Sequence, residues 1–196
     1  SEEPVTYLTY NITNRKEDMW LAMIGCIADH YLPDFSDDFL SNYPEFWGKV
    51  KAPFDAYYNT EIGKIARALN FGLKDSVTNV IKLQNFLIST RSPSEVFLEC
   101  PANSTFRKKY IEVKSKYEDL IMKARENVEH NLIFFEYGGE LSISSDISNE
   151  LSYRFPKKYI AVAYKKGEIT NLSLRGKNVR AILERVLKKV EGRGGG

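Results

Sequence analysis

Three features of this sequence combine residue types that could do chemistry. Asp29 follows an apolar segment, and Ser173 and Arg175 stand two residues apart at the end of a predicted strand. The chain closes on three consecutive glycines, Gly194, Gly195 and Gly196. A carboxylate can bind a divalent metal ion. A hydroxyl, a guanidinium and glycine N–H groups are instead suited to a phosphate.

The segment before Asp29 explains why this carboxylate stands out. Residues 14–28 are polar in the first turn and then apolar on every side, which predicts a buried helix. A carboxylate closing a buried helix costs free energy unless it is paired, caps a neighbour or binds a metal. The residues alone leave open whether Asp29 is a metal ligand or a buried cap. For the nearby acids Asp34, Asp37 and Asp38, we predict solvated turn and N-cap positions.

Ser173 and Arg175 belong to a predicted hairpin with strands at 159–164 and 168–174. Alternate residues of a strand share a face, so the hydroxyl and the guanidinium would point the same way. The alternative is an ordinary surface arginine beside a strand end. An amphipathic helix is predicted over 178–190, and the glycines after it are either a frayed tail or a backbone nest for a phosphate.

Charge is distributed unevenly along the chain. Residues 156–193 hold eleven Lys or Arg against three Asp or Glu, a net charge of about +8, although the whole chain carries only +2. The remainder is therefore acidic. A strongly basic segment favours a phosphate-bearing partner, for which Lys165, Lys166, Lys177 and Arg180 would provide electrostatic steering.

The other segments predict a mixed α/β (α+β) protein. Residues 4–10 are predicted to be extended, and residues 53–89 to be helical. A long helix at 103–129 has apolar residues every three or four positions, which is typical of a connector between two lobes. The last lobe is predicted as β, β, α, β, β, α on a small mixed sheet. Its first three elements fall at 131–137, 140–144 and 146–153.

The amino-acid composition limits the classes of protein to which this chain can belong. The 196 residues are 43% hydrophobic and 28% charged, which is typical of a globular protein. No window is apolar enough for a membrane span, and residues 1–10 do not resemble a signal peptide, so we expect no membrane association and a cytoplasmic location. Cys26 and Cys100 are predicted to be free thiols.

The order of the three features resembles the DHH/DHHA1 phosphoesterase superfamily, and within it the RecJ-like single-strand-specific nucleases of the archaeal kind. In that family an aspartate closing a helix of the type Ala-Leu-Gly-Thr-Ile-Ala-Asp binds the catalytic manganese pair. Residues 24–29, Ile-Gly-Cys-Ile-Ala-Asp, match this pattern and give Asp29 the role of catalytic residue and metal ligand. The family's DHHA1 lobe binds the nucleic-acid end through Ser-x-Arg and a glycine motif. The matching substrate-binding residues here are Ser173, Arg175, Gly194, Gly195 and Gly196, with Lys177 beside them.

The resemblance implies four parts: the end of a DHH-type metal-binding domain (1–35), a helical insertion (36–102), a connector helix (103–130) and a DHHA1-like substrate-binding domain (131–196). It implies a Mn²⁺ or Mg²⁺ pair acting on single-stranded DNA or RNA, or on short oligonucleotides, with replication or repair proteins as further partners. The family's Asp-His-His motif is absent, because Asp29-His30-Tyr31 is a different motif. The remaining metal ligands are therefore expected upstream of Ser1, which makes the chain the rear part of a longer protein and inactive alone.

Two other interpretations remain open. The chain could belong to a non-catalytic DHH-like scaffold in a replication or repair assembly. It could also be a stand-alone nucleic-acid-binding DHHA1 lobe, although such a lobe has no need of the segment around Asp29.

Overall fold

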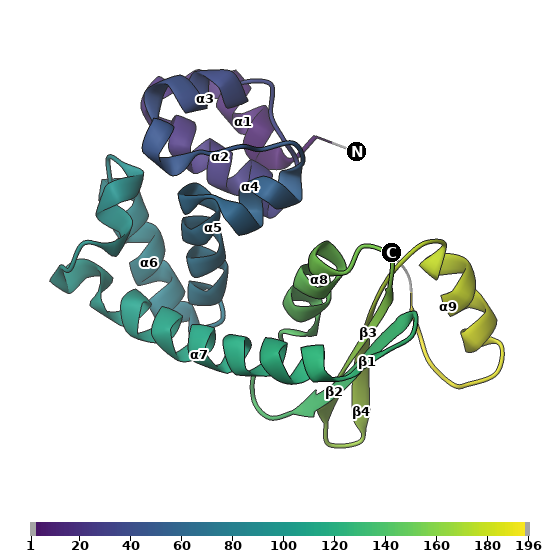
Figure 1. The fold of residues 1–196 in the computed structure, drawn as a ribbon. Helices are drawn as coiled ribbons and strands as arrows, with labels where there is room; N and C mark the ends of the chain where they lie inside the picture. The colour runs from purple at the N-terminus through teal and green to yellow at the C-terminus, as the bar shows by residue number, and fades with distance from the viewer. Residues whose placement is uncertain (1–2, 195–196) are drawn as a thin grey trace. The chain divides into compact units, whose positions relative to one another are not determined.

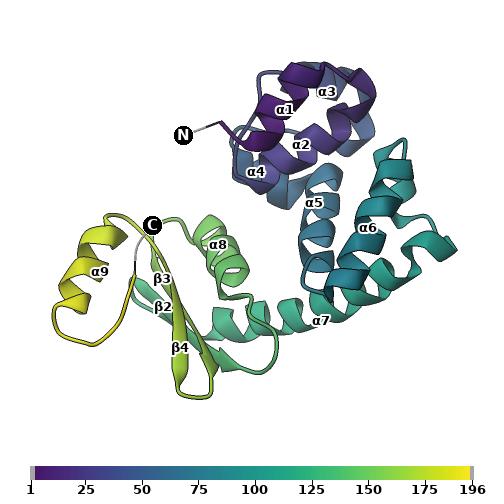
Figure 2. The same ribbon diagram turned by 180° about the vertical axis from the view of Figure 1, so that it is seen from behind.

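The computed structural model describes residues 3–194, which form two compact units, the first ending at Lys114 and the second beginning at Ser115. Figures 1 and 2 show a helical first unit and a second unit built on a sheet. The mixed α and β content predicted from the sequence is confirmed. The boundary between the units lies inside the long helix α7 (Ser104–Glu126), so the predicted connector contributes residues to both.

The first unit is made of helices joined by short turns. Its α-helices before α7 are α1 (Val5–Thr13), α2 (Met19–Ala28), α3 (Ser36–Asn42), α4 (Pro53–Asn59), α5 (Glu61–Gly72) and α6 (Val77–Ser89). Its 3₁₀ turns are η1 (Lys16–Asp18), η2 (Pro44–Phe46), η3 (Pro93–Phe97) and η4 (Pro101–Asn103). The prediction of helices over 53–89 is confirmed.

Helix α2 lies at the centre of the first unit. As predicted from its apolar sequence, most of α2 is buried, and Trp20, Met23 and Ile27 are fully buried. It packs on α5, whose Ile62 and Ile65 belong to the same core, and also contacts α1, α3 and α4. Burial of these apolar side chains stabilises the unit through the hydrophobic effect.

The predicted extended conformation of residues 4–10 is wrong, because Val5–Thr13 forms helix α1. Tyr7 is buried, donates from its hydroxyl to a carboxylate oxygen of Asp34 at 3.0 Å, and packs its ring near those of Tyr31 and Phe35. These tertiary contacts override the strand propensity of a Val-, Thr- and Tyr-rich segment.

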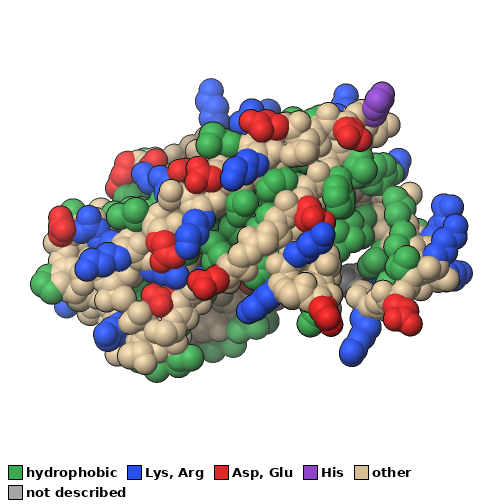
Figure 3. All heavy atoms as spheres, turned by 90° about the horizontal axis from the view of Figure 1, so that it is seen from below, with side chains coloured by type: hydrophobic (Ala, Val, Ile, Leu, Met, Phe, Trp, Pro, Cys, Tyr) green, Lys and Arg blue, Asp and Glu red, His purple; other side chains and the backbone are tan. Residues whose placement is uncertain are grey.

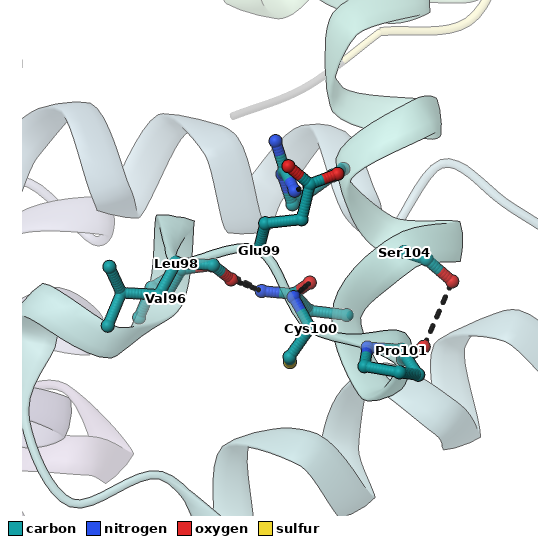
Figure 4. A network of polar contacts seen from close by, with 8 residues as sticks. Val96, Leu98, Glu99, Cys100, Pro101 and Ser104 are labelled. Carbon is teal, nitrogen blue, oxygen red and sulfur yellow. Dashed lines mark hydrogen bonds and ion pairs between the residues drawn. The ribbon is translucent and has the colours of Figure 1, made fainter.

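The start of α7 is fixed by a polar turn. Asn103 is fully buried, and its amide donates to the carbonyl oxygens of Val96 and Leu98 at 3.1 and 2.6 Å. The Ser104 hydroxyl donates to the Pro101 carbonyl at 2.9 Å, as Figure 4 shows. Because these side chains satisfy backbone groups left unpaired at the turn, α7 begins at a defined residue.

The second unit contains a four-stranded mixed sheet in the order β1-β2-β3-β4. The strands are β1 (Val128–Glu129), β2 (Leu132–Gly138), β3 (Tyr159–Lys166) and β4 (Ile169–Arg175), and the helices after α7 are α8 (Ser144–Arg154) and α9 (Val179–Leu187). Strands β2 and β3 are parallel, and the other two pairs are antiparallel. The predicted small mixed sheet and its two helices are confirmed.

The predicted strand at 140–144 is wrong. The Tyr137 hydroxyl accepts from the Ile143 N–H at 2.8 Å, and the Tyr164 hydroxyl donates to the Gly139 carbonyl at 2.7 Å. Two tyrosines therefore satisfy the backbone of this loop, and α8 already begins at Ser144. The strand that pairs with β2 on that side is β1, which precedes it in the chain.

The two faces of the sheet differ in how they are covered. Helix α8 packs on β3 and β4 over one face, whereas α9 lies on the opposite side (Figures 1 and 2). A cavity of about 370 Å³ separates α9 from this second face, where Tyr159, Leu174 and Ile182 are among its lining residues. Phe134, on the same face, is 50% exposed.

The basic character of the C-terminal segment is visible on the surface. At the right-hand end of Figure 3, where α9 lies, Lys and Arg side chains stand around hydrophobic ones. Among residues 3–194, no helix combines the length and the apolar character that crossing a bilayer requires.

Candidate functional site

Ser173 and Arg175 lie on the face of β4 that α8 covers. In the antiparallel register, Ser173 stands opposite Val162 and Arg175 opposite Ile160, both of which are buried on that face. The expectation that the hydroxyl and the guanidinium share a face is confirmed. Both side chains are half-buried, which leaves part of each open to solvent.

The guanidinium of Arg175 is held in place by residues of α8 and β4. Its Nε donates to Oδ1 of Asn149 at 2.7 Å, and one terminal nitrogen donates to the Leu174 carbonyl at 2.7 Å. The other terminal nitrogen donates to Oγ of Ser145 at 3.2 Å. These contacts fix the orientation of a planar fork, so less side-chain entropy is lost when the fork pairs with an anion.

Two serines at the start of α8 complete this polar cluster. The Oγ atoms of Ser144 and Ser173 are 2.9 Å apart, and Ser144 is buried. Ile143 precedes the helix and offers no side-chain acceptor to the N–H groups of its first turn. A helix start with unsatisfied N–H groups attracts an anion. We call Ser144, Ser145, Asn149, Ser173 and Arg175 the serine–arginine cluster.

One feature of the serine–arginine cluster opposes anion binding. Asp146 also lies in the first turn of α8 and brings a carboxylate to the positive end of the helix. A phosphate at this position would be repelled by that carboxylate, so its binding would depend on the positive charge of Arg175.

The other predicted substrate-binding residues lie elsewhere in the second unit. Lys177 is exposed between β4 and α9. A Cβ built on Gly194 would lie 3.0 Å from a methyl carbon of Leu183 on α9, so this glycine contacts α9 and is not among the residues that hydrogen-bond within the serine–arginine cluster. Gly195 and Gly196 lie outside the described residues.

Two of the four cations proposed to steer a ligand have acidic neighbours. Lys165 pairs with Glu136 on the adjacent strand at 2.8 Å, and Arg180 stands 3.6 Å from Glu184. These exposed pairs are weak and are screened by salt. The steering role therefore rests on the net charge of the segment.

Asp29 is exposed, which corrects the expectation of a buried carboxylate. It is the C-cap residue of α2, and its N–H donates to the Gly25 carbonyl at 3.1 Å. Helix α2 is buried over most of its length, but its last turn reaches the surface at Ala28. Solvent can hydrate the carboxylate there, so the desolvation argument for a partner does not apply.

Within residues 3–194, no three His, Cys, Asp or Glu side chains are grouped so that they could bind a metal ion. Asp34, a nearby acid of the same segment, accepts a hydrogen bond from the Tyr7 hydroxyl. The described residues alone do not fit a two-metal centre around Asp29.

The thiol of Cys26, which lies on α2 shortly before Asp29, should be unreactive. Burial, together with the negative charges of Asp29 and Asp34, raises the pKa of the Cys26 thiol to about 12. Because the thiolate is the nucleophile, its population at pH 8 falls by about a thousandfold relative to an ordinary cysteine. We expect a thiol reagent to label one cysteine per native chain, the half-buried Cys100, and both cysteines in guanidinium chloride.

The labelling is read by intact mass. The Cys100→Ser variant should take up no label on the same timescale while native. Rapid labelling of Cys26 in that variant would contradict the burial described above.

Sequence reasoning missed Ser144, Ser145 and Asn149. The run Ser144-Ser145-Asp146 is typical of a helix start and could have indicated these serines. The prediction instead ended a strand at Ser144 and began the helix at Asp146. Asn149 carried no local signal, because its role depends on the packing of α8 on β4.

Comparisons with known proteins add no identification: no family model matches this chain, and a search of curated proteins found no match.

Proposed function

We propose that the chain is the C-terminal part of a metal-dependent phosphodiesterase of the DHH type, a RecJ-like exonuclease for single-stranded nucleic acid. In this proposal the second unit binds the phosphate at the end of the substrate. The observation that supports it best is the placement of Ser173 and Arg175 on one face of β4, beside the uncapped start of α8. A guanidinium fork, hydroxyls and helix N–H groups together form an arrangement suited to a phosphate.

The proposal gives each residue of the serine–arginine cluster a role in binding. Arg175 neutralises the phosphate charge, while Asn149 and the Leu174 carbonyl keep its guanidinium oriented. The Ser145 hydroxyl accepts from Arg175 and can at the same time donate to a phosphate oxygen, and the Ser173 hydroxyl can do so when Ser144 donates to it. The basic C-terminal segment raises the local concentration of the polyanion.

Asp29 is proposed as one ligand of a Mn²⁺ or Mg²⁺ pair, as the resemblance implies. Because the described residues do not form a metal site around it, the proposal requires the other ligands from outside this sequence.

The binding proposal is tested with short single strands that carry a 5′ phosphate, a 3′ phosphate or neither. We expect Arg175→Lys to weaken binding of a phosphorylated strand about tenfold, because lysine retains the charge but loses the fork. Ser173→Ala should weaken it by a smaller factor. The dependence of affinity on salt should stay close to that of the wild type in Arg175→Lys, since the number of charges is unchanged.

Arg185→Lys is the matched control, because Arg185 is an exposed arginine of α9 outside the serine–arginine cluster. It should bind within about twofold of the wild type. Equal binding of strands with and without a terminal phosphate, or no effect of Arg175→Lys, would show that the serine–arginine cluster is not a phosphate site.

Cleavage is a separate test, made on a form of the protein that carries the remaining metal ligands. We expect a labelled single strand to be cut in Mn²⁺, and Asp29→Ala to abolish the cutting. If that form binds single strands and leaves them intact in both Mn²⁺ and Mg²⁺, the non-catalytic scaffold becomes the better interpretation.

A further inference from the structure

Four side chains of the first unit form a continuous, partly exposed surface of rings and charge. His30 follows α2, Phe54 and Tyr58 lie on α4, and Arg67 lies on α5. The ring centroids of His30 and Phe54 are 4.3 Å apart, and those of Phe54 and Tyr58 are 5.9 Å apart with planes inclined by only 9°. The Arg67 guanidinium lies 5.6 Å from the Tyr58 ring centroid. We call these four residues the aromatic ledge.

The backbone holds the aromatic ledge in place. Phe54 and Tyr58 are four residues apart on one helix, so their rings lie on the same side of α4. Arg67 donates a hydrogen bond to the Tyr57 carbonyl, which anchors the guanidinium between α4 and α5. His30 has a left-handed conformation, with φ of 56°, and its N–H donates to the Ile27 carbonyl at 3.1 Å. This sharp turn at the end of α2 brings the imidazole against Phe54.

The partial exposure of the aromatic ledge is shared by other rings of this unit, such as Trp47, Phe97 and Tyr110. The ledge is distinguished by two rings with nearly parallel planes beside a guanidinium. Tyr57, behind it, is 8% exposed, and Phe39 is fully buried within its own aromatic group. His30, Phe54, Tyr58 and Arg67 are all only half-buried. Partly open rings with an adjacent guanidinium are the combination on which nucleobases stack.

We propose that the aromatic ledge stacks a base of a single-stranded nucleic acid. This inference rests on the proposed function, because it assigns a second contact to the same substrate. The ledge begins at His30, the residue directly after Asp29, so the stacked base would lie beside the proposed metal ligand. Every base has a π face on which a ring can stack. Binding there should therefore tolerate any sequence.

The test uses the full chain and a short 5′-phosphorylated strand containing 2-aminopurine, whose fluorescence is quenched by stacking. We expect the wild-type chain to quench it. Phe54→Leu and Tyr58→Leu should each remove most of the quenching and weaken binding by about tenfold, within the range measured for single base–aromatic contacts. Tyr58→Phe retains the ring and should behave as the wild type does.

Phe134→Leu is the control for loss of an exposed ring, since Phe134 lies on the sheet of the second unit and is 50% exposed. It should change neither binding nor quenching. An abasic site in place of 2-aminopurine should weaken binding to the wild type by the same factor as Tyr58→Leu, and should have little further effect on that variant. Melting temperatures of all variants show whether a loss reflects unfolding.

The outcomes separate this inference from the proposed function. Binding that needs Arg175 but is unaffected by Phe54→Leu and Tyr58→Leu would overturn the aromatic ledge and leave the phosphate site standing. Binding that needs the aromatic ledge and tolerates Arg175→Lys would overturn the phosphate site and leave the aromatic ledge standing. A wild-type chain that binds no single strand would overturn both.

Discussion

Replacing Gly63 with alanine is expected to lower the free energy of unfolding of the first unit by about 3 kcal/mol, at the upper end of the cost of overpacking. Helices α4 and α5 meet at Gly63, where an added Cβ would collide with the carbonyl oxygens of Ala56 and Tyr57. These are backbone atoms, so the helices themselves would have to separate. The collision lies directly beneath the aromatic ledge, and the variant should therefore also lose quenching of a stacked base.

Both tryptophans of the chain, Trp20 and Trp47, belong to the first unit. Tryptophan fluorescence during urea titration therefore reports the unfolding of that unit selectively. Gly48→Ala is the matched control, because nothing lies within 4 Å of its added Cβ, and it should change stability by less than about 0.5 kcal/mol. A Gly63→Ala variant as stable as the wild type would show that α4 and α5 are farther apart than described.

Replacing Glu150 with alanine should destabilise the second unit by about 2 to 3 kcal/mol. The Glu150 carboxylate is 8% exposed, accepts from the Tyr117 hydroxyl of α7, and accepts from Arg154 Nε at 2.7 Å. Hydrogen bonds to a buried charge are strong, and their loss leaves the Tyr117 hydroxyl without this acceptor. The effect stays below that of a fully buried ion pair because the Arg154 side chain is 48% exposed and can be hydrated.

Glu184→Ala provides the matched control, since Arg180 and Glu184 form another Arg–Glu pair four residues apart on a helix. Those side chains are 78% and 65% exposed, so the loss should be about 0.3 kcal/mol. Hydrogen exchange followed by mass spectrometry is the measurement, because the second unit has no tryptophan. Amides of β3 should exchange about thirtyfold faster or more in Glu150→Ala, and at the wild-type rate in Glu184→Ala. Equal rates in both variants would mean that Glu150 does not hold α8 on α7.

The apolar patterns in the sequence determined several elements directly. Residues 19–28 are hydrophobic on every side, and burial of that helix follows from composition alone. Strands β3 and β4 and helix α9 could be predicted because a β-branched hairpin with a glycine turn and an amphipathic helix each have a distinct periodicity. The shared face of Ser173 and Arg175 followed from the two-residue repeat of a strand.

Segments with ambiguous propensity were decided only by the tertiary structure. Residues 5–13 are helical because Tyr7 packs on residues of a later segment, and residues 139–143 form a loop because the hydroxyls of Tyr137 and Tyr164 bond their backbone. No local pattern contains these contacts.

The same distinction applies to the candidate sites. The sequence by itself determined that Ser173 and Arg175 would point together and that the C-terminal segment would be basic. Only the fold brought Ser145 and Asn149 to Arg175, exposed Asp29, and placed His30 against Phe54. The physical reason is that spacing along a single element fixes which side chains share a face, whereas the partners of that face come from packing between elements distant in sequence.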